Sequence, residues 1–302
     1  MKASISLVVM VVTMVGTLLA GAGAPEAASV QLVIAGALSA PSGTSQDGQI
    51  TLRAGVGLSV LLVNGGAVVP GSVGTATAVR WSDTTPTSGF TSPADLIVLH
   101  FGSLMVVAAG INTPGGPVTT FSATPPFDGL SGTWTLAAGP GSGVSGAGAG
   151  DAVLTFNFEV SPVNPQQAQL MLYYTLLTSL SKPVQGVGTA GVNRNVPVYL
   201  IASDQVGPPI GTMTYYDVSS IPGHAGTDFA GITAINVGGF YVLYACAFPD
   251  AVTGIACLVG GNGPVARLSG HADVLAGQFV TPGHPYGVTI YDQLVTLTVS
   301  LP

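Results

Sequence analysis

The chain of 302 residues carries a net charge of -7, and only 6% of its residues are charged, where an average soluble domain has about 25%. Beyond residue 28 its only cations are Arg53, Arg80, Lys182, Arg194 and Arg267, too few to neutralise a phosphate backbone, so nucleic-acid binding is excluded. A surface with so little charge is weakly protected from association, which favours packing against copies of itself, against carbohydrate or within a matrix outside the cell.

The first 28 residues have the three-part layout of a secretory signal peptide. Lys2 precedes an apolar run over residues 5–19, which leads into small residues and then into the polar pair Pro25-Glu26. The apolar run is shorter than the roughly 20 residues that a membrane-spanning helix needs. We therefore expect cleavage between residues 22 and 28, a secreted or cell-surface product, and no membrane span in the mature chain. A retained N-terminal anchor is the alternative.

Alternating and short apolar runs, bounded by turn-forming residues, recur through the rest of the chain and predict an all-β protein. The clearest strands are residues 154–160 and 295–301, where apolar side chains occupy every second position. Asn64-Gly65 predicts a tight hairpin turn. Residues 165–180 contain good helix formers, but their tyrosines and threonines favour a strand after a turn.

The most favourable domain boundary is residues 161–165, because this segment follows a strong strand and contains two prolines that cannot lie inside a ladder. The prediction is a β-sandwich or jelly-roll fold, either one large sandwich or two tandem ones, with halves at residues 29–162 and 163–302. The sequence shows no convincing internal repeat.

The segment next to the new N-terminus, residues 29–38, has Val30, Leu32 and Ile34 in alternation. Such a strand suits donation to the open sheet of a neighbouring subunit, with main-chain hydrogen bonds giving affinity and the apolar side chains giving register. In this general layout the chain resembles secreted β-sandwich pilins and archaeal thread-like filament subunits that assemble by donor-strand complementation. The alternative is that these residues form the first strand of their own sandwich.

Cys246 and Cys257 are the only cysteines, and an even count in an exported chain predicts a disulfide. The residues between them include turn-forming Pro249-Asp250 and Thr253-Gly254, which suit a connection between two short strands. A redox motif would need closer spacing, and a zinc site would need more ligands than two thiols.

Metal-binding candidates are confined to the second half of the chain. Imidazole and carboxylate groups there have the chemistry to bind a metal if the fold brings them together. Their spacing matches no standard ligand motif, and loop histidines beside glycine are commonly just exposed. The candidates are His224, Asp228, His271, Asp273 and His284.

The sequence lacks the marks of catalysis and of cofactor binding. It has no serine nucleophile elbow and no phosphate-binding loop, so we expect a non-enzymatic protein without a cofactor. Aromatic side chains offer a sugar-stacking alternative, although most aromatic residues in a β protein pack in the core. The aromatic candidates are Trp81, Trp134, Tyr215, Tyr216, Tyr241 and Tyr286.

Together these features favour an extracellular structural subunit of a filament, coat or matrix that associates with identical subunits. The second hypothesis is a monomeric secreted adhesin or carbohydrate-binding module with a glycan or surface partner. The third is a secreted hydrolase, which would require the histidines and aspartates of the second half to converge in a pocket.

Overall fold

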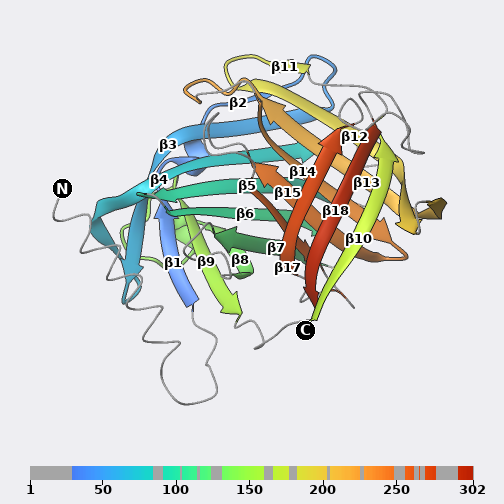
Figure 1. The fold of residues 1–302 in the computed structure, drawn as a ribbon. Helices are drawn as coiled ribbons and strands as arrows, with labels where there is room; N and C mark the ends of the chain where they lie inside the picture. The colour runs from blue at the N-terminus through green and yellow to red at the C-terminus, as the bar shows by residue number, and fades with distance from the viewer. Residues whose placement is uncertain are drawn as a thin grey trace.

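The computed structural model describes two β-barrels that lie side by side, with the first in blue to green and the second in yellow to red (Figure 1). The described residues are 29–83, 91–102, 104–113, 116–123, 131–159, 166–176, 182–202, 205–224, 228–247, 256–261, 265, 269–276 and 292–301. The predicted signal peptide lies outside them. Neither of the described helices, η1 (Ala37–Ser39) and η2 (Gly139–Gly141), is long and apolar enough to cross a membrane.

The first barrel is an antiparallel meander in which, from β2 onward, each strand pairs with the next along the chain. It closes because β1 pairs with β9 on one side and with the second half of β3 on the other. The short β2 pairs with the first half of β3, so β1 and β2 share one edge of that strand. Its strands are β1 (Ser29–Ile34), β2 (Ser42–Thr44), β3 (Ile50–Asn64), β4 (Ala67–Asp83), β5 (Thr91–Phe101), β6 (Leu104–Thr113), β7 (Gly116–Ala123), β8 (Ser131–Ala138) and β9 (Ala152–Glu159).

The second barrel repeats this arrangement strand for strand. β10 pairs with β18 and with the end of β12, and the short β11 pairs with the beginning of β12. Its strands are β10 (Gln166–Thr175), β11 (Lys182–Val184), β12 (Gly188–Ala202), β13 (Gln205–Ser219), β14 (Asp228–Val237), β15 (Phe240–Ala247), β16 (Ala256–Gly261), β17 (Ser269–Ala276) and β18 (Asp292–Leu301).

The all-β prediction is confirmed, but the architecture differs from the sandwich or jelly roll that the sequence suggested. Each sheet is a closed ring of eight strands, in which β1 and β10 each pair on both sides. The topology also reveals an internal repeat that the sequence did not. The predicted boundary after residue 162 falls between the end of β9 and the start of β10.

The β1 strand, predicted as a candidate donor strand, is the first strand of its own barrel in this structure. Leu32 and Ile34 are buried in the barrel core, and Val30 packs against it. Register pairs such as Leu32 with Leu154 on β9 and with Leu62 on β3 engage both edges of the strand. Donation of β1 to a neighbour would therefore require the first barrel to open.

Side chains fill the centre of the first barrel. Phe121 packs edge to face against Phe156 and Phe158, with ring centroids 5.0 and 5.3 Å apart. Trp134 is buried and donates its indole N–H to the carbonyl oxygen of Ala109 at 3.0 Å. The interior is thus a packed core, as expected for a barrel of eight strands.

The second barrel has its own core, to which the predicted terminal strand contributes. Val295, Leu297 and Val299 of β18 are buried inside, as their alternation predicts. Tyr174 and Tyr244 are also buried there and are hydrogen-bonded to each other through their hydroxyls. Within the ambiguous segment 165–180, residues 166–175 form strand β10.

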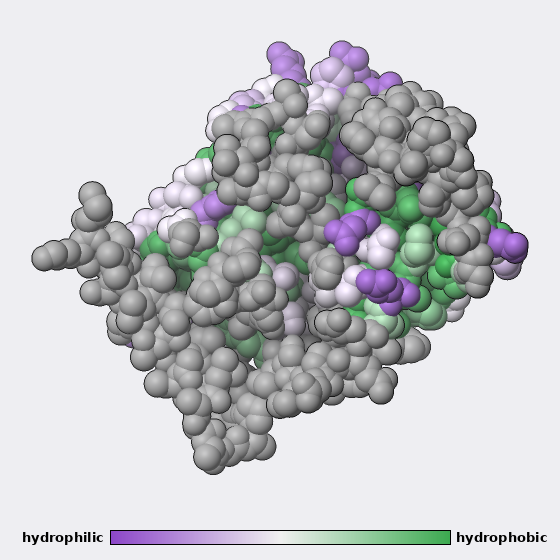
Figure 2. All heavy atoms as spheres, in the orientation of Figure 1, coloured by the Kyte–Doolittle hydropathy of each residue, from purple (hydrophilic) through white to green (hydrophobic). Residues whose placement is uncertain are grey.

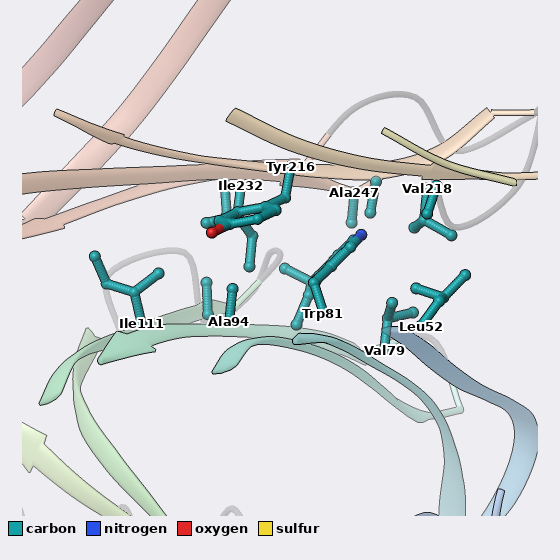
Figure 3. Close-up of a cluster of buried hydrophobic side chains, with 14 of the residues drawn as sticks. Leu52, Val79, Trp81, Ala94, Ile111, Tyr216, Val218, Ile232 and Ala247 are labelled. Carbon is teal, nitrogen blue, oxygen red and sulfur yellow. The ribbon is translucent and has the colours of Figure 1, made fainter. Parts of the chain in front are cut away.

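A third hydrophobic core joins the two barrels. Leu52, Val79 and Trp81 of the first barrel point towards the second, where Tyr216 and Val218 face them (Figure 3). The strands in contact are topological counterparts: β3 lies against β12, β5 against β14, β6 against β15 and β7 against β16. The barrels therefore meet through the same face of each, in the manner of a symmetric dimer interface.

The tight hairpin between β3 and β4 forms one residue later than predicted. Asn64 pairs with Ala67 as the last rung of the ladder, so the turn residues are Gly65 and Gly66, which both have positive φ. A two-residue turn of this kind needs positive φ at both positions, and glycine adopts it without strain. The other Asn-Gly pair, at residues 262–263, lies outside the described residues.

Candidate functional site

Polar groups at the junction between the barrels form one connected cluster. Arg194 of β12 donates from Nε and Nη2 to the two carboxylate oxygens of Asp83 on β4, each at 2.7 Å. Its Nη1 donates to Gln49 Oε1 at 2.8 Å, and the Tyr216 hydroxyl donates to Asp83 Oδ2 at 3.2 Å. Burial, followed by the charge of Asp83 and this hydrogen bond, raises the pKa of Tyr216. The hydrogen bonds of this cluster connect side chains of the first barrel to side chains of the second.

A cleft of about 170 Å³ lies between the barrels and shares the residue Gln49 with this cluster. Ser45, Asp47 and Gln49 line it from the first barrel, and Lys182 lines it from the second. Asp47 accepts hydrogen bonds from the Ser45 hydroxyl at 2.6 Å and the Gln49 backbone at 3.1 Å, and these bonds lower its pKa. The Asp47 carboxylate, the strongest hydrogen-bond acceptor that lines the cleft, is therefore already engaged with neighbouring protein groups.

A row of charged side chains crosses the inner face of the first barrel. Arg53 on β3 lies directly opposite Arg80 on β4, which lies directly opposite Asp95 on β5. Arg80 donates from Nε to Asp95 Oδ1 at 2.6 Å and from Nη2 to Asp95 Oδ2 at 3.0 Å. The Nε of Arg53 is buried and has no hydrogen-bond partner among the described residues.

Electrostatics within this row reflect competition between burial and pairing. Burial raises the pKa of Asp95, and the neighbouring Arg80 and Arg53 oppose that rise. Burial also disfavours the charged form of Arg80, but the hydrogen bond and charge of Asp95 outweigh it, so the pKa of Arg80 is raised. The row therefore combines one carboxylate with two guanidinium groups, and the Arg80–Asp95 pair leaves Arg53 as the additional cation.

A small cavity of about 20 Å³ adjoins the charged row. Apart from the charged groups its lining is largely apolar, and it includes Ala37 and Leu38 of helix η1. A cavity needs about 10–15 Å³ to hold one water molecule, so this one suits an occupant of one or two water-sized atoms. The barrel interior is otherwise filled by the aromatic core.

The predicted metal candidates do not form a cluster in the described part of the chain. His224 lies in the turn after β13, Asp228 begins β14, and His271 and Asp273 lie on β17. β17 is separated from β14 by two strands of the barrel. No three His, Cys, Asp or Glu side chains among the described residues are placed to hold a metal ion. His284 lies outside the described residues.

The predicted disulfide partners lie on neighbouring strands. Cys246 on β15 is directly opposite Cys257 on β16 in the antiparallel register. Directly opposite residues in an antiparallel pair have Cβ atoms about 4.5–5.5 Å apart, close to the spacing that a disulfide needs. The backbone register is thus compatible with the bridge, which stays a prediction.

Four of the aromatic residues considered for sugar stacking are core residues. Trp81, Trp134, Tyr216 and Tyr241 are each less than 5% exposed. Tyr215 packs against the core of the second barrel, and Tyr286 lies outside the described residues. These buried rings are unavailable for contact with a ligand at the surface.

A different aromatic pair lies on the outer face of the second barrel. Tyr173 on β10 is directly opposite Tyr199 on β12, with ring centroids 6.1 Å apart and ring planes tilted by 42°. Both rings are half-buried, and Met171 and Ile201 pack beside them. Hydrophobic side chains are also visible on the surface of this barrel in Figure 2. Sequence reasoning missed this pair because Tyr173 and Tyr174 are adjacent in β10 and face opposite sides of the strand. The sequence alone does not show which of the two tyrosines faces outward.

Sequence reasoning also missed the charged row. A usable signal was present: Arg53, Arg80 and Asp95 each have apolar residues close by in the sequence, in a chain with only six lysines and arginines. In so charge-poor a protein, charged residues inside β-strands indicate a specific role for those side chains. Comparison of the chain with protein-family models, with characterised proteins and with solved structures found no match.

Proposed function

We propose that this chain is a non-enzymatic extracellular protein that serves as a structural subunit of a filament, coat or matrix. The observation that carries the proposal is the continuous hydrophobic core between the barrels, which makes the molecule one rigid block. The inter-barrel ion pair adds a fixed geometry to that block. A rigid block with a charge-poor surface is suited to regular packing against copies of itself.

Exposed apolar residues at corresponding places in the two barrels support this proposal. Val69 near the start of β4 is 37% exposed, and Val206 near the start of β13 is 41% exposed. Both follow the hairpin turn that joins the two longest strands of their barrel. One subunit thus offers two similar apolar contacts at separate places, as a chain of subunits requires.

Two modes of assembly are distinguishable by locking β1 in place. Gln31 and Thr155 are opposite each other on the outer face of β1 and β9, with Gln31 Nε2 donating to Thr155 Oγ1 at 3.2 Å. A Q31C/T155C variant would covalently tie β1 to its own barrel when oxidised. Assembly by strand donation would stop on oxidation and return on reduction, whereas assembly through surface contacts would continue in both states.

The test uses the mature chain beginning at Ser29, the Q31C/T155C variant, and single Q31C as the control. Light scattering after size-exclusion chromatography and negative-stain electron microscopy would report assembly over a range of concentrations. We expect regular polymers that V69S/V206S weakens. A wild-type protein that stays monomeric up to high concentration would overturn the proposal.

A secreted carbohydrate-binding module is the second candidate, and the Tyr173–Tyr199 pair favours it. Two neighbouring rings on the outside of a rigid barrel present an apolar platform with polar hydroxyls, the kind of surface that contacts sugar rings. Glycan-array binding that is lost in Y173A and Y199A but kept in T298A, on the neighbouring β18, would support this function. Absence of binding in the wild type would exclude it for the glycans tested.

A further inference from the structure

The charged row inside the first barrel has an excess of one positive charge. Arg80 and Asp95 form a bidentate pair, in which each carboxylate oxygen accepts one guanidinium hydrogen bond. Such pairs satisfy both partners and largely cancel each other's charge. Arg53 lies in the same row, next to Arg80, and its charge has no such compensation within the row.

The position of Arg53 makes this excess charge consequential. Its Nε is buried without a hydrogen-bond partner among the described residues. A buried N–H donor on a charged group is costly to leave unsatisfied, because that atom has lost its hydrogen bond to water and made none to the protein, even though the Arg53 side chain as a whole is only half-buried. Two neighbouring guanidinium groups also repel each other, and an anion between or beside them relieves that repulsion.

The cavity beside the row limits what such an anion can be. Its volume of about 20 Å³ is too small for a tetrahedral oxyanion such as sulfate or phosphate. Ile34, Ala37 and Leu136 contribute apolar wall, which favours a weakly hydrated anion over a strongly hydrated one. Arg80 and Asp95 keep part of their side chains exposed, at 28% and 16%, so the row is in contact with solvent.

We propose that the first barrel binds a small monovalent anion of about the size of chloride at Arg53, in the cavity that Ala37 and Leu38 of helix η1 help to line. The second barrel does not share the site. On the corresponding strands, its inner face carries the row Gly191, Asp217 and Gly231, which contains an acid and no arginine. One anion per chain is therefore expected.

The test measures thermal unfolding of the mature protein in sodium chloride, sodium bromide or sodium acetate, with sodium sulfate holding the ionic strength constant. Bound anion stabilises the folded state by mass action, so the unfolding midpoint should rise with the logarithm of chloride concentration once binding saturates. Acetate distinguishes a carboxylate from a halide, since a rise with acetate alone would identify a carboxylate site. Bromide-soaked crystals should give one anomalous peak beside Arg53.

The key variant is Arg53→Gln, and Lys182→Gln is its matched control because it removes one positive charge at the cleft between the barrels. We expect Lys182→Gln to keep the chloride-dependent rise and Arg53→Gln to lose it, with both variants folded by circular dichroism. An equal rise in Arg53→Gln would mean a general salt effect and would overturn the proposal. So would a wild type whose midpoint is insensitive to all three monovalent anions.

Discussion

Asp83 and Arg194, 111 positions apart in the chain, form a bidentate ion pair that spans the two barrels. Only 2% of the Asp83 side chain and 15% of the Arg194 side chain are exposed. Gln49 and Tyr216 satisfy further hydrogen-bonding capacity of the pair, so both charges are fully compensated where they are buried. Geometry of this quality offsets the cost of desolvation and fixes the angle between the barrels.

Removing one partner of this pair should destabilise the whole molecule. Asp83→Asn leaves Arg194 buried without a counter-charge, so we expect a loss of about 3 kcal/mol in the free energy of unfolding. The double variant D83N/R194Q should recover part of that loss, because no unpaired charge remains. Urea unfolding measures both, with Asp47→Asn as an exposed control. A D83N effect below that of D47N would contradict a structural role for the pair.

The shared core predicts that the two barrels unfold together. Trp81 is fully buried at the interface and donates its indole N–H to the carbonyl oxygen of Asp217 in the second barrel at 2.8 Å. Trp81→Phe loses this hydrogen bond and leaves a small cavity, so a loss of about 2–3 kcal/mol is expected. Fluorescence and far-ultraviolet circular dichroism should still report one coincident transition. Two separate transitions in the wild type would show that the barrels are independent.

Sequence patterns located strands well where one face of the strand differs from the other. Along β18, buried Val295, Leu297 and Val299 alternate with threonines, and that alternation correctly predicted a strand with one buried face. Along β6, by contrast, nearly every residue is buried, because its inner face lines a barrel and its outer face meets the other barrel. Such a strand has the same signature as one at the centre of a sandwich, so sandwich and barrel were not distinguishable.

Closure and repetition depend on contacts that leave no local trace in the sequence. The first barrel closes through pairing of β1 with β9, whose partners Leu32 and Leu154 are far apart in the chain. The repeat is hidden because corresponding positions have diverged: Arg53 and Arg80 lie on β3 and β4, where the second barrel has Gly191 and Asp217. The charged row was missed for the same reason, since it exists only once the strands are in register.

Buried tyrosines of the second barrel should make stability fall at alkaline pH. Burial raises the pKa of Tyr244 from 10.0 to about 12, and burial raises the pKa of Tyr174 as well. Between pH 10 and 12 the folded state therefore holds protons that the unfolded state releases, so the free energy of unfolding decreases as pH rises. For Tyr244 alone the decrease is on the order of 2 kcal/mol.

This pH dependence is measurable by urea unfolding at a series of pH values. Tyr244→Phe should unfold with a shallower decrease between pH 10 and 12 than the wild type, although it also loses the hydrogen bond to Tyr174. Tyr199→Phe, on the outer face, controls for loss of a tyrosine hydroxyl. Equal slopes in the wild type and Tyr244→Phe would show that Tyr244 titrates at its ordinary pKa.

The register of β15 and β16 makes the disulfide prediction specific. Because Cys246 and Cys257 are directly opposite, a bridge between them closes a short loop and staples one hairpin of the second barrel. A loop of this length limits the stabilisation to about 2–3 kcal/mol, less than a bridge between distant strands would provide. Intact mass before and after reduction should differ by two hydrogens, and the double variant C246S/C257S should unfold at lower urea concentration. Reactivity of both thiols in the unreduced, unfolded protein would disprove the bridge, and the hairpin would then depend on the β15–β16 ladder and on pairing with β14 and β17.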